Sequence, residues 1–126
     1  MPLADTTDLL RNLGDAGMST REACGNVVRN VVAAPTAGVS KDEAFAVTPY
    51  AAADARYFLR HPTTQNMPRK SKVAFSGSEK DEAMVLMHDV GMLARVRDDV
   101  LGFKIVVGDG LSTNAMMAKT LREFVP

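Results

Sequence analysis

The sequence predicts an α+β domain with a mostly antiparallel sheet that carries its helices on one side. The first half of the chain has apolar residues at helical spacing, whereas the second half alternates between apolar and polar residues as strands do. A last helical pattern follows the strands. The 126 residues fit one domain, residues 1–126, and no repeat or low-complexity segment divides them.

Helical patterns occupy three segments of the first half. Residues 4–14 place leucines on one face and end in glycine. Residues 19–33 open with Ser19, a capping residue followed three positions later by Glu22, and their valines recur at helical spacing. Residues 49–60 start with a proline, which suits the first turn of a helix. We therefore expect a helix in each segment.

Alternation marks the second half of the chain. Residues 70–76, 92–97 and 101–107 read as strands, the last two separated by an Asp-Asp turn. The Gly-Asp-Gly sequence at 108–110 favours a turn with positive φ, and residues 113–124 read as a final helix. About three strands make a poor stand-alone sheet, so the pattern indicates that further strands come from elsewhere.

Composition limits the classes of function. Lys plus Arg and Asp plus Glu each number 15, so the formal net charge is zero and whole-chain electrostatics favour no nucleic-acid partner. No signal peptide is visible, and no apolar run approaches the about 20 residues that span a bilayer. The single cysteine, Cys24, cannot form a disulfide framework or a metal cluster by itself, and it fits a reducing, cytoplasmic setting.

Local concentrations of positive charge are the candidate sites. Lys70 and Lys72 stand two residues apart on a predicted strand, so both ammonium groups project from one face. An anion between them would offset their repulsion; alternatively, they are solvated lysines that discourage edge pairing. Arg29 lies between valines in the predicted helix 19–33, near Gly25. Its guanidinium suits carboxylates and small oxyanions, unless it is a surface residue beside a packing glycine.

The remaining reactive residues predict no second site. His61 and His88 have no ligand-like spacing and read as structural, although His88 could donate a proton. Cys24 is expected to be buried and inert. Residues 108–110 lack the pattern of a dinucleotide loop, and no catalytic triad or metal-ligand set can be assembled.

Four motifs in order resemble the nitrite/sulfite reductase family. Residues 20–31, TREACGNVVRNV, resemble its helix motif. Residues 61–62, HP, followed by residues 66–72, NMPRKSK, resemble its LPRKFK segment. Residues 88–91, HDVG, and 102–112, GFKIVVGDGLS, resemble its HDIG and GF…VGGGL segments. Any one motif is weak, but four in the same order over about residues 15–126 are specific.

The resemblance implies a half-domain of a reductase in which sirohaem lies between pseudo-symmetric halves and is coupled to a 4Fe–4S cluster. Arg29, Lys70 and Lys72 would then be catalytic residues around the substrate. Arg69 and Asn26 would bind sirohaem. The implied function is a part of a sulfite reductase; the alternatives are a nitrite reductase fragment, a non-catalytic sirohaem- or oxyanion-binding half-domain, and a purely structural half-domain.

The resemblance also implies partners. These are sulfite or nitrite, the remainder of the reductase, and an electron donor such as ferredoxin or a flavoprotein, with no nucleic acid and no membrane. We expect the isolated chain to be inactive, because the cysteines that bind the cluster lie in a later part of the family and nothing here matches them. Ser71 also replaces a bulky apolar residue, Asp109 replaces the middle glycine of the turn, and residues 76–78 are polar where many relatives carry a cysteine.

Overall fold

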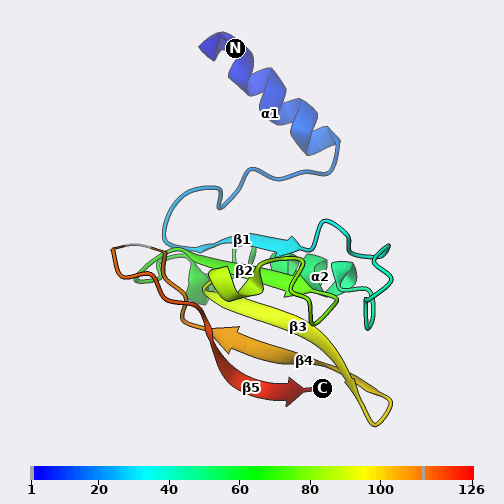
Figure 1. Cartoon of the computed structure of the whole chain (residues 1–126). Coiled ribbons are helices and arrows are strands. Elements are labelled where there is room, and N and C mark those ends of the chain that lie inside the picture. Colours follow the sequence, from blue (N-terminus) through cyan, green and yellow to red (C-terminus); the bar gives the residue numbers. More distant parts are fainter. Residues whose placement is uncertain (1, 112) are drawn as a thin grey trace.

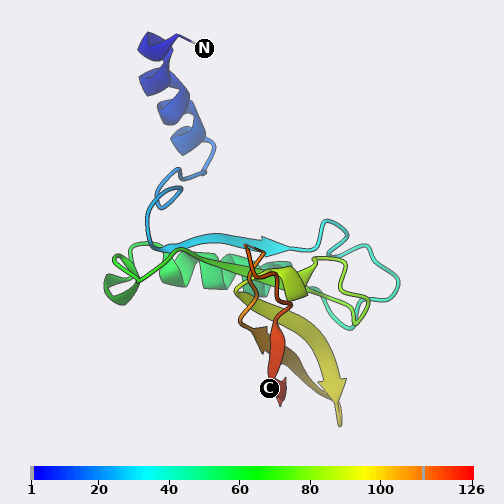
Figure 2. The same cartoon turned by 60° about the vertical axis from the view of Figure 1, so that its left-hand side comes forward.

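The computed structural model describes residues 2–111 and 113–126, which contain one five-stranded sheet in the order β1-β2-β3-β4-β5. Helix α2 lies along the sheet, while helix α1 projects away from it (Figures 1 and 2). The elements, with η for a 3-10 helical turn, are η1 (Leu3–Asp5), α1 (Thr6–Asp15), β1 (Val28–Ala33), α2 (Thr48–Phe58), η2 (Pro62–Thr64), β2 (Ser71–Ser76), η3 (Val85–Met87), β3 (Val90–Arg97), β4 (Val100–Val107) and β5 (Lys119–Val125).

The α+β class is confirmed, but the sheet is mixed rather than mostly antiparallel. Strand β2 pairs in parallel with both β1 and β3, whereas β4 pairs antiparallel with both β3 and β5. Parallel neighbours need a long crossover, and the segment between β1 and β2 supplies one that contains α2. The predicted helices 4–14 and 49–60 and all three predicted strands are confirmed as η1 with α1, α2, β2, β3 and β4.

The predicted helix at residues 19–33 is wrong, because its second half is strand β1. Valine is β-branched and packs well on a pleated surface, and short apolar runs leave helix and strand ambiguous. The first half is a loop: Glu22 and Gly25 have φ of 61° and 100°, which no right-handed helix contains. The Ser19 Oγ accepts a hydrogen bond from the Arg21 N–H (3.2 Å), as a turn rather than as a helix cap.

The predicted helix at residues 113–124 is also wrong, because residues 119–125 form the edge strand β5. Its ladder with β4 runs from Val107↔Lys119 to Phe103↔Val125 with two irregularities. This pairing is long-range, so it overrides the local helical spacing. The five strands of the described residues exceed the three expected because β1 and β5 had both been interpreted as helices.

Apolar side chains cover both faces of the central strands. Val73 and Phe75 of β2 pack with Val47 and Ala51, on the face that α2 covers. Ala74 of β2 points the other way and joins a second cluster. The buried members of that cluster are Ala34, Ala74, Ala83, Val85, Leu93, Val106 and Ala118. Strand β2 is therefore held from both sides.

Helix α1 differs from the rest of the fold because none of its residues is buried. Both views show it extended from the sheet at the end of the loop that leads to β1 (Figures 1 and 2). Among the described residues, no helix is long and apolar enough to cross a bilayer.

Candidate functional site

The amino ends of β1 and β2 lie side by side and carry most of the predicted site residues. The ladder pairs Val28 with Ser71 and Asn30 with Lys72, so its register shifts at Arg29. Arg29 is therefore on an irregular strand and not on a helix as predicted. Such bulges re-aim side chains and often occur beside functional sites.

A cavity of about 410 Å³, here called the lysine pocket, brings three of the predicted residues together. Its lining consists of Arg69, Lys70, Lys72, Met87, Asp89, Asp109, Gly110 and Leu111. One wall is the start of β2, and the facing wall is formed by the end of η3 and the turn after β4. Lys70 directly precedes β2 and Lys72 is the second residue of that strand, and both line the pocket, as their spacing of two residues predicts.

The turn that closes the lysine pocket tolerates the aspartate in the middle of its Gly-Asp-Gly sequence. Positive φ falls on Gly108 (88°) and not on Asp109. Gly110 forms a bridge with Met116 through hydrogen bonds in both directions. The expected positive φ of this turn is confirmed at Gly108, and Asp109 adds a carboxylate to the pocket.

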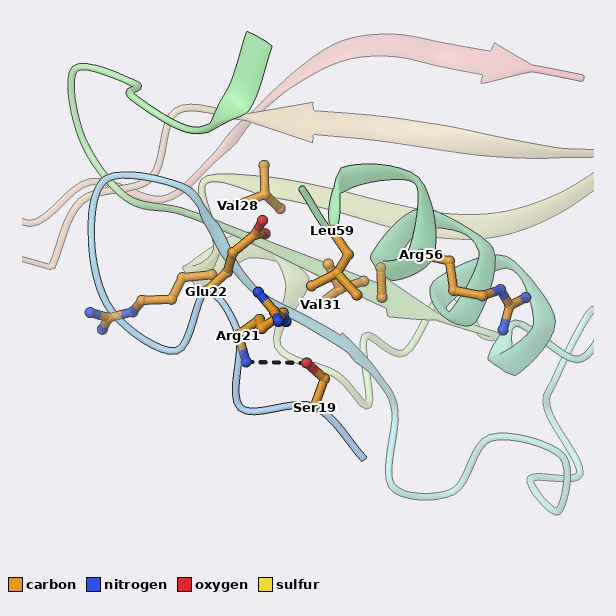
Figure 3. Close-up of a pocket in the computed structure, with 9 residues that line it drawn as sticks. Ser19, Arg21, Glu22, Val28, Val31, Arg56 and Leu59 are labelled. Carbon is orange, nitrogen blue, oxygen red and sulfur yellow. Dashed lines mark hydrogen bonds between the residues drawn. The ribbon is translucent and has the colours of Figure 1, made fainter. Parts of the chain in front are cut away.

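Arg29 lines a different cavity, of about 230 Å³, here called the arginine pocket (Figure 3). Its lining consists of Ser19, Arg21, Glu22, Val28, Arg29, Val31, Ala55, Arg56 and Leu59. Figure 3 shows it between the loop that carries Arg21 and Glu22 and the helix that carries Arg56. The two pockets have no lining residue in common, so the structure does not bring Arg29 into one cavity with the lysines.

The lining of the arginine pocket carries more positive than negative charge, because it contains three arginines and one acidic residue. Glu22 is its only acidic residue, and the Glu22 carboxylate accepts hydrogen bonds from the Arg60 N–H and from Gln65 Nε2 (2.8 Å). No ion pair in the described part of the chain involves Arg21, Arg29 or Arg56. Arg21 and Arg56 were missed as site residues, since only the fold places the end of α2 beside the loop before β1.

Asn26 lies outside both pockets. Its side chain is exposed, and its backbone C=O accepts a hydrogen bond from the Met67 N–H (2.8 Å). The adjacent Val27 C=O accepts one from the Ser71 N–H (2.9 Å). These two hydrogen bonds therefore hold the segment that contains Arg69, just before β2, against residues 26–27.

Asp89 also lines the lysine pocket, and its one sequence signal is its place in the HDVG motif. Its Oδ2 accepts a hydrogen bond from the Lys72 N–H (2.9 Å), and its backbone C=O accepts one from the Gly108 N–H (3.1 Å). His88 beside it bonds locally, with Nδ1 2.9 Å from the Met84 C=O.

Cys24 is exposed, which corrects the expectation that it is buried. It belongs to the loop before β1 and not to a helix packed on the core. A 4Fe–4S cluster takes about four thiolates, and this chain has one cysteine, so its own residues do not fit such a cluster. Within residues 2–111 and 113–126, no group of three or more His, Cys, Asp or Glu could hold a metal ion.

Comparisons with known proteins show similarity over most of the chain. Residues 24–126 match the family model described as the nitrite and sulphite reductase 4Fe-4S domain. The chain is 35% identical over 125 residues to sulfite reductase (ferredoxin) 1 of Mycolicibacterium paratuberculosis, covering 98% of this chain and 22% of that protein. It is 26% identical over 118 residues to the ferredoxin–nitrite reductase of Leptolyngbya laminosa, covering 84% of this chain and 22% of that protein.

A solved structure shows the same fold. The NirA protein of Mycobacterium tuberculosis matches with a TM-score of 0.84 and 35% identity, covering 97% of this chain and 22% of that chain. The present chain thus spans about 22% of the length of these relatives. On the family model and the similarity in sequence and fold, the chain belongs to the nitrite and sulphite reductase family.

Proposed function

We propose that the chain supplies the anion-binding part of a sulfite reductase, which reduces sulfite to sulfide with six electrons at a sirohaem and 4Fe–4S centre. The observation that carries the proposal is the lysine pocket, in which Arg69, Lys70 and Lys72 line one cavity. Relatives named sulfite reductase support this substrate. Reduction of nitrite to ammonia is the alternative, because relatives named nitrite reductase match as well.

Lys70, Lys72 and Arg29 are the proposed catalytic residues. The two ammonium groups stabilise the negative charge of the bound anion, and each carries protons on Nζ that can pass to an oxygen as it departs as water. Arg29 adds a planar donor for an oxyanion from the neighbouring strand β1. To act with the lysines, its side chain must turn from the arginine pocket toward the amino end of β2.

Arg69 and Asn26 are the proposed sirohaem-binding residues. Sirohaem carries many carboxylates, and the exposed guanidinium of Arg69 in a pocket with two further cations fits such a group. When bound, sirohaem supplies the redox centre that passes electrons to the anion. The cluster's cysteines and the rest of the active site must come from other sequence.

The proposed partners are the remainder of the reductase and an electron donor, with ferredoxin favoured by the names of the relatives and a flavoprotein as the other option. The proposed location is the cytoplasm. A non-catalytic half-domain that binds sirohaem or an oxyanion is the second candidate.

The proposal is tested in a full-length reductase that contains this chain. Replacing Lys70 and Lys72 together with alanine, or Arg29 alone, should lower the turnover of sulfite by at least about 100-fold, because transition-state charge loses its partners. The sirohaem absorbance spectrum should stay nearly unchanged. Arg69→Ala should instead lower the sirohaem content.

Lys80→Ala is the matched control, since Lys80 is an exposed lysine paired with Asp42 and outside the lysine pocket. It should leave turnover unchanged. Sulfite turnover at the wild-type level in the Lys70/Lys72 variant would refute the assigned roles. Sirohaem binding without any sulfite or nitrite turnover in the wild-type full-length protein would favour the non-catalytic half-domain.

A further inference from the structure

Asp89 joins the two walls of the lysine pocket. It directly precedes β3, and its side-chain Oδ2 accepts the Lys72 N–H at 2.9 Å. Its backbone C=O accepts the N–H of Gly108 at 3.1 Å, in the turn after β4. Through these two hydrogen bonds, one residue holds both the start of β2 and the facing turn.

The hydrogen bond from Lys72 falls where the sheet itself gives β2 no partner on that side. The β2–β3 ladder begins at Val73↔Val90, one residue after Lys72. On the other side, the β1–β2 ladder is irregular between Val28 and Asn30. At Lys72, the Asp89 carboxylate therefore takes the place of a β3 partner, one residue before the β2–β3 ladder begins.

The support for Asp89 is rigid. Gly91, two residues later, lies so close to η3 and β4 that a Cβ there would come within 2.7 Å of the Val85 backbone oxygen and 2.6 Å of Val106 Cγ2. The start of β3 is therefore closely packed against η3 and β4. An acceptor on such a fixed support can hold a strand end in a single geometry.

Electrostatics alone would not select a carboxylate at this position. Asp89 and Asp109 both line a pocket whose three cations are proposed to bind an anion, and each carboxylate opposes that binding. A hydrogen bond from a backbone N–H to a carboxylate is stronger than one to a neutral acceptor. The stronger bond to the Lys72 N–H therefore offsets the repulsion between Asp89 and the anion. Asp109 has no hydrogen bond to β2 among the described residues.

From these contacts we propose that Asp89 is a positioning residue that fixes the amino end of β2, so that the Lys70 and Lys72 ammonium groups both reach the bound anion. Asp89 acts through the Lys72 backbone and does not itself touch the substrate. This inference rests on the proposed function of the two lysines, which it deepens.

Four variants of the full-length reductase separate positioning from charge. Asp89→Ala removes both the acceptor and the charge. Asp89→Asn keeps an acceptor oxygen of the same reach and removes only the charge, as does Asp109→Asn at the other carboxylate. Asp89→Leu keeps the branched shape of Asn, although it is larger, and has no acceptor. It replaces Asp89→Ala if that variant does not fold.

The first measurement is hydrogen–deuterium exchange of the peptide that contains Lys72. Asp89→Ala or Asp89→Leu should raise exchange at this amide by at least about tenfold, because the N–H loses its only partner on that side. Asp89→Asn and Asp109→Asn should stay within about twofold of wild type. Unchanged exchange in both Asp89→Ala and Asp89→Leu would overturn the proposal.

The second measurement is the KM and kcat for sulfite. Asp89→Ala or Asp89→Leu should raise KM about tenfold, whereas Asp89→Asn and Asp109→Asn should lower it about twofold as a negative charge leaves the pocket. A lowered KM in Asp89→Ala would overturn the positioning role. If exchange rises but none of the four variants changes KM, the role of the lysines would be refuted, and with it the proposed function. The anchoring of β2 by Asp89 would still stand.

Discussion

The parallel and antiparallel halves of the sheet are stabilised differently. In the parallel half, the last four residues of β2 are buried, between the face covered by α2 and the cluster around Val85 and Leu93. In the antiparallel half, none of the seven residues of β5 is buried, and the β3–β4 hairpin exposes Val96, Val100 and Leu101. The views in Figures 1 and 2 show this hairpin extending beyond the body that contains α2.

Around the edge strand β5, charged and aromatic contacts take the place of buried apolar ones. Arg95 of β3 pairs with Glu79 and with Glu123 of β5, and Lys104 of β4 lies 3.6 Å from Glu123. The Arg97 guanidinium lies 4.9 Å from the centre of the Phe124 ring. Both pockets border the parallel strands β1 and β2, and the lysine pocket lies at the amino end of β2, beside the buried part of that strand.

The largest expected effect is the loss of stability when Phe75 of the parallel half is truncated, compared with the same change at Phe124 of the antiparallel half. Phe75 is 4% exposed, and the centre of its ring lies 5.7 Å from the centre of the Phe103 ring. Phe75→Ala should therefore lower the free energy of unfolding by about 3–5 kcal/mol. Phe124 is half-exposed, and Phe124→Ala should cost about 1 kcal/mol through the lost cation–π contact. Urea denaturation measures both, and equal losses would contradict the contrast between the halves.

Gly91, at the junction of the two halves, should give an intermediate effect. Gly91→Ala places a Cβ within 2.7 Å of a backbone oxygen, so it should lower the free energy of unfolding by about 1–3 kcal/mol. The matched control is Gly14→Ala in α1, where nothing lies within 4 Å of the added Cβ. Thermal denaturation should show a lower Tm for the first variant and no loss for the second.

The smallest effect is expected for Glu79→Gln, which breaks the ion pair with Arg95 in the antiparallel half. The hydrogen bond from Arg95 lowers the pKa of Glu79, so the carboxylate stabilises the folded state above its unfolded-state pKa. This contribution disappears as the pH falls through the lowered pKa. Because the Glu79 side chain is 60% exposed, the difference from wild type at pH 7 should be at most about 1 kcal/mol and should shrink in high salt.

Urea denaturation at pH 7 and pH 3 measures that difference. The control is Asp8→Asn, which breaks a more exposed pair with Arg11 on α1, a helix without buried residues. Asp8→Asn should leave the free energy of unfolding unchanged at both pH 7 and pH 3. A Glu79→Gln effect that is larger at pH 3 than at pH 7 would contradict the assigned cause.

What the sequence predicts well depends on local pattern. Strands β2 and β4 were predicted because their alternation is strong, and the shared pocket of Lys70 and Lys72 follows from their spacing on one strand. The helix at residues 49–60 was predicted from its proline and spacing and is α2. The position of a residue in the fold is therefore predictable where the residues next to it in the sequence determine its secondary structure.

What the sequence predicts poorly depends on partners far along the chain. Residues 28–33 and 119–125 form strands because β2 and β4 offer them edges, although their own spacing also suits a helix. The bulge at Arg29 arises from pairing across more than 40 residues of sequence, so its cavity could not be predicted. The contact of Asp89 with Lys72 likewise exists only after β2 and β3 are placed together.

The placement of Lys70 and Lys72 at the start of β2 also determines how this region tolerates insertions. One extra residue between Lys70 and Lys72 would turn one lysine to the opposite side of the sheet, because side chains alternate at every position. An extra residue in the polar connector at 61–69 would lengthen a surface loop at a small entropic cost. During divergence, length changes can therefore accumulate before Arg69, whereas between Lys70 and Val73 they would dismantle the pocket in a single step.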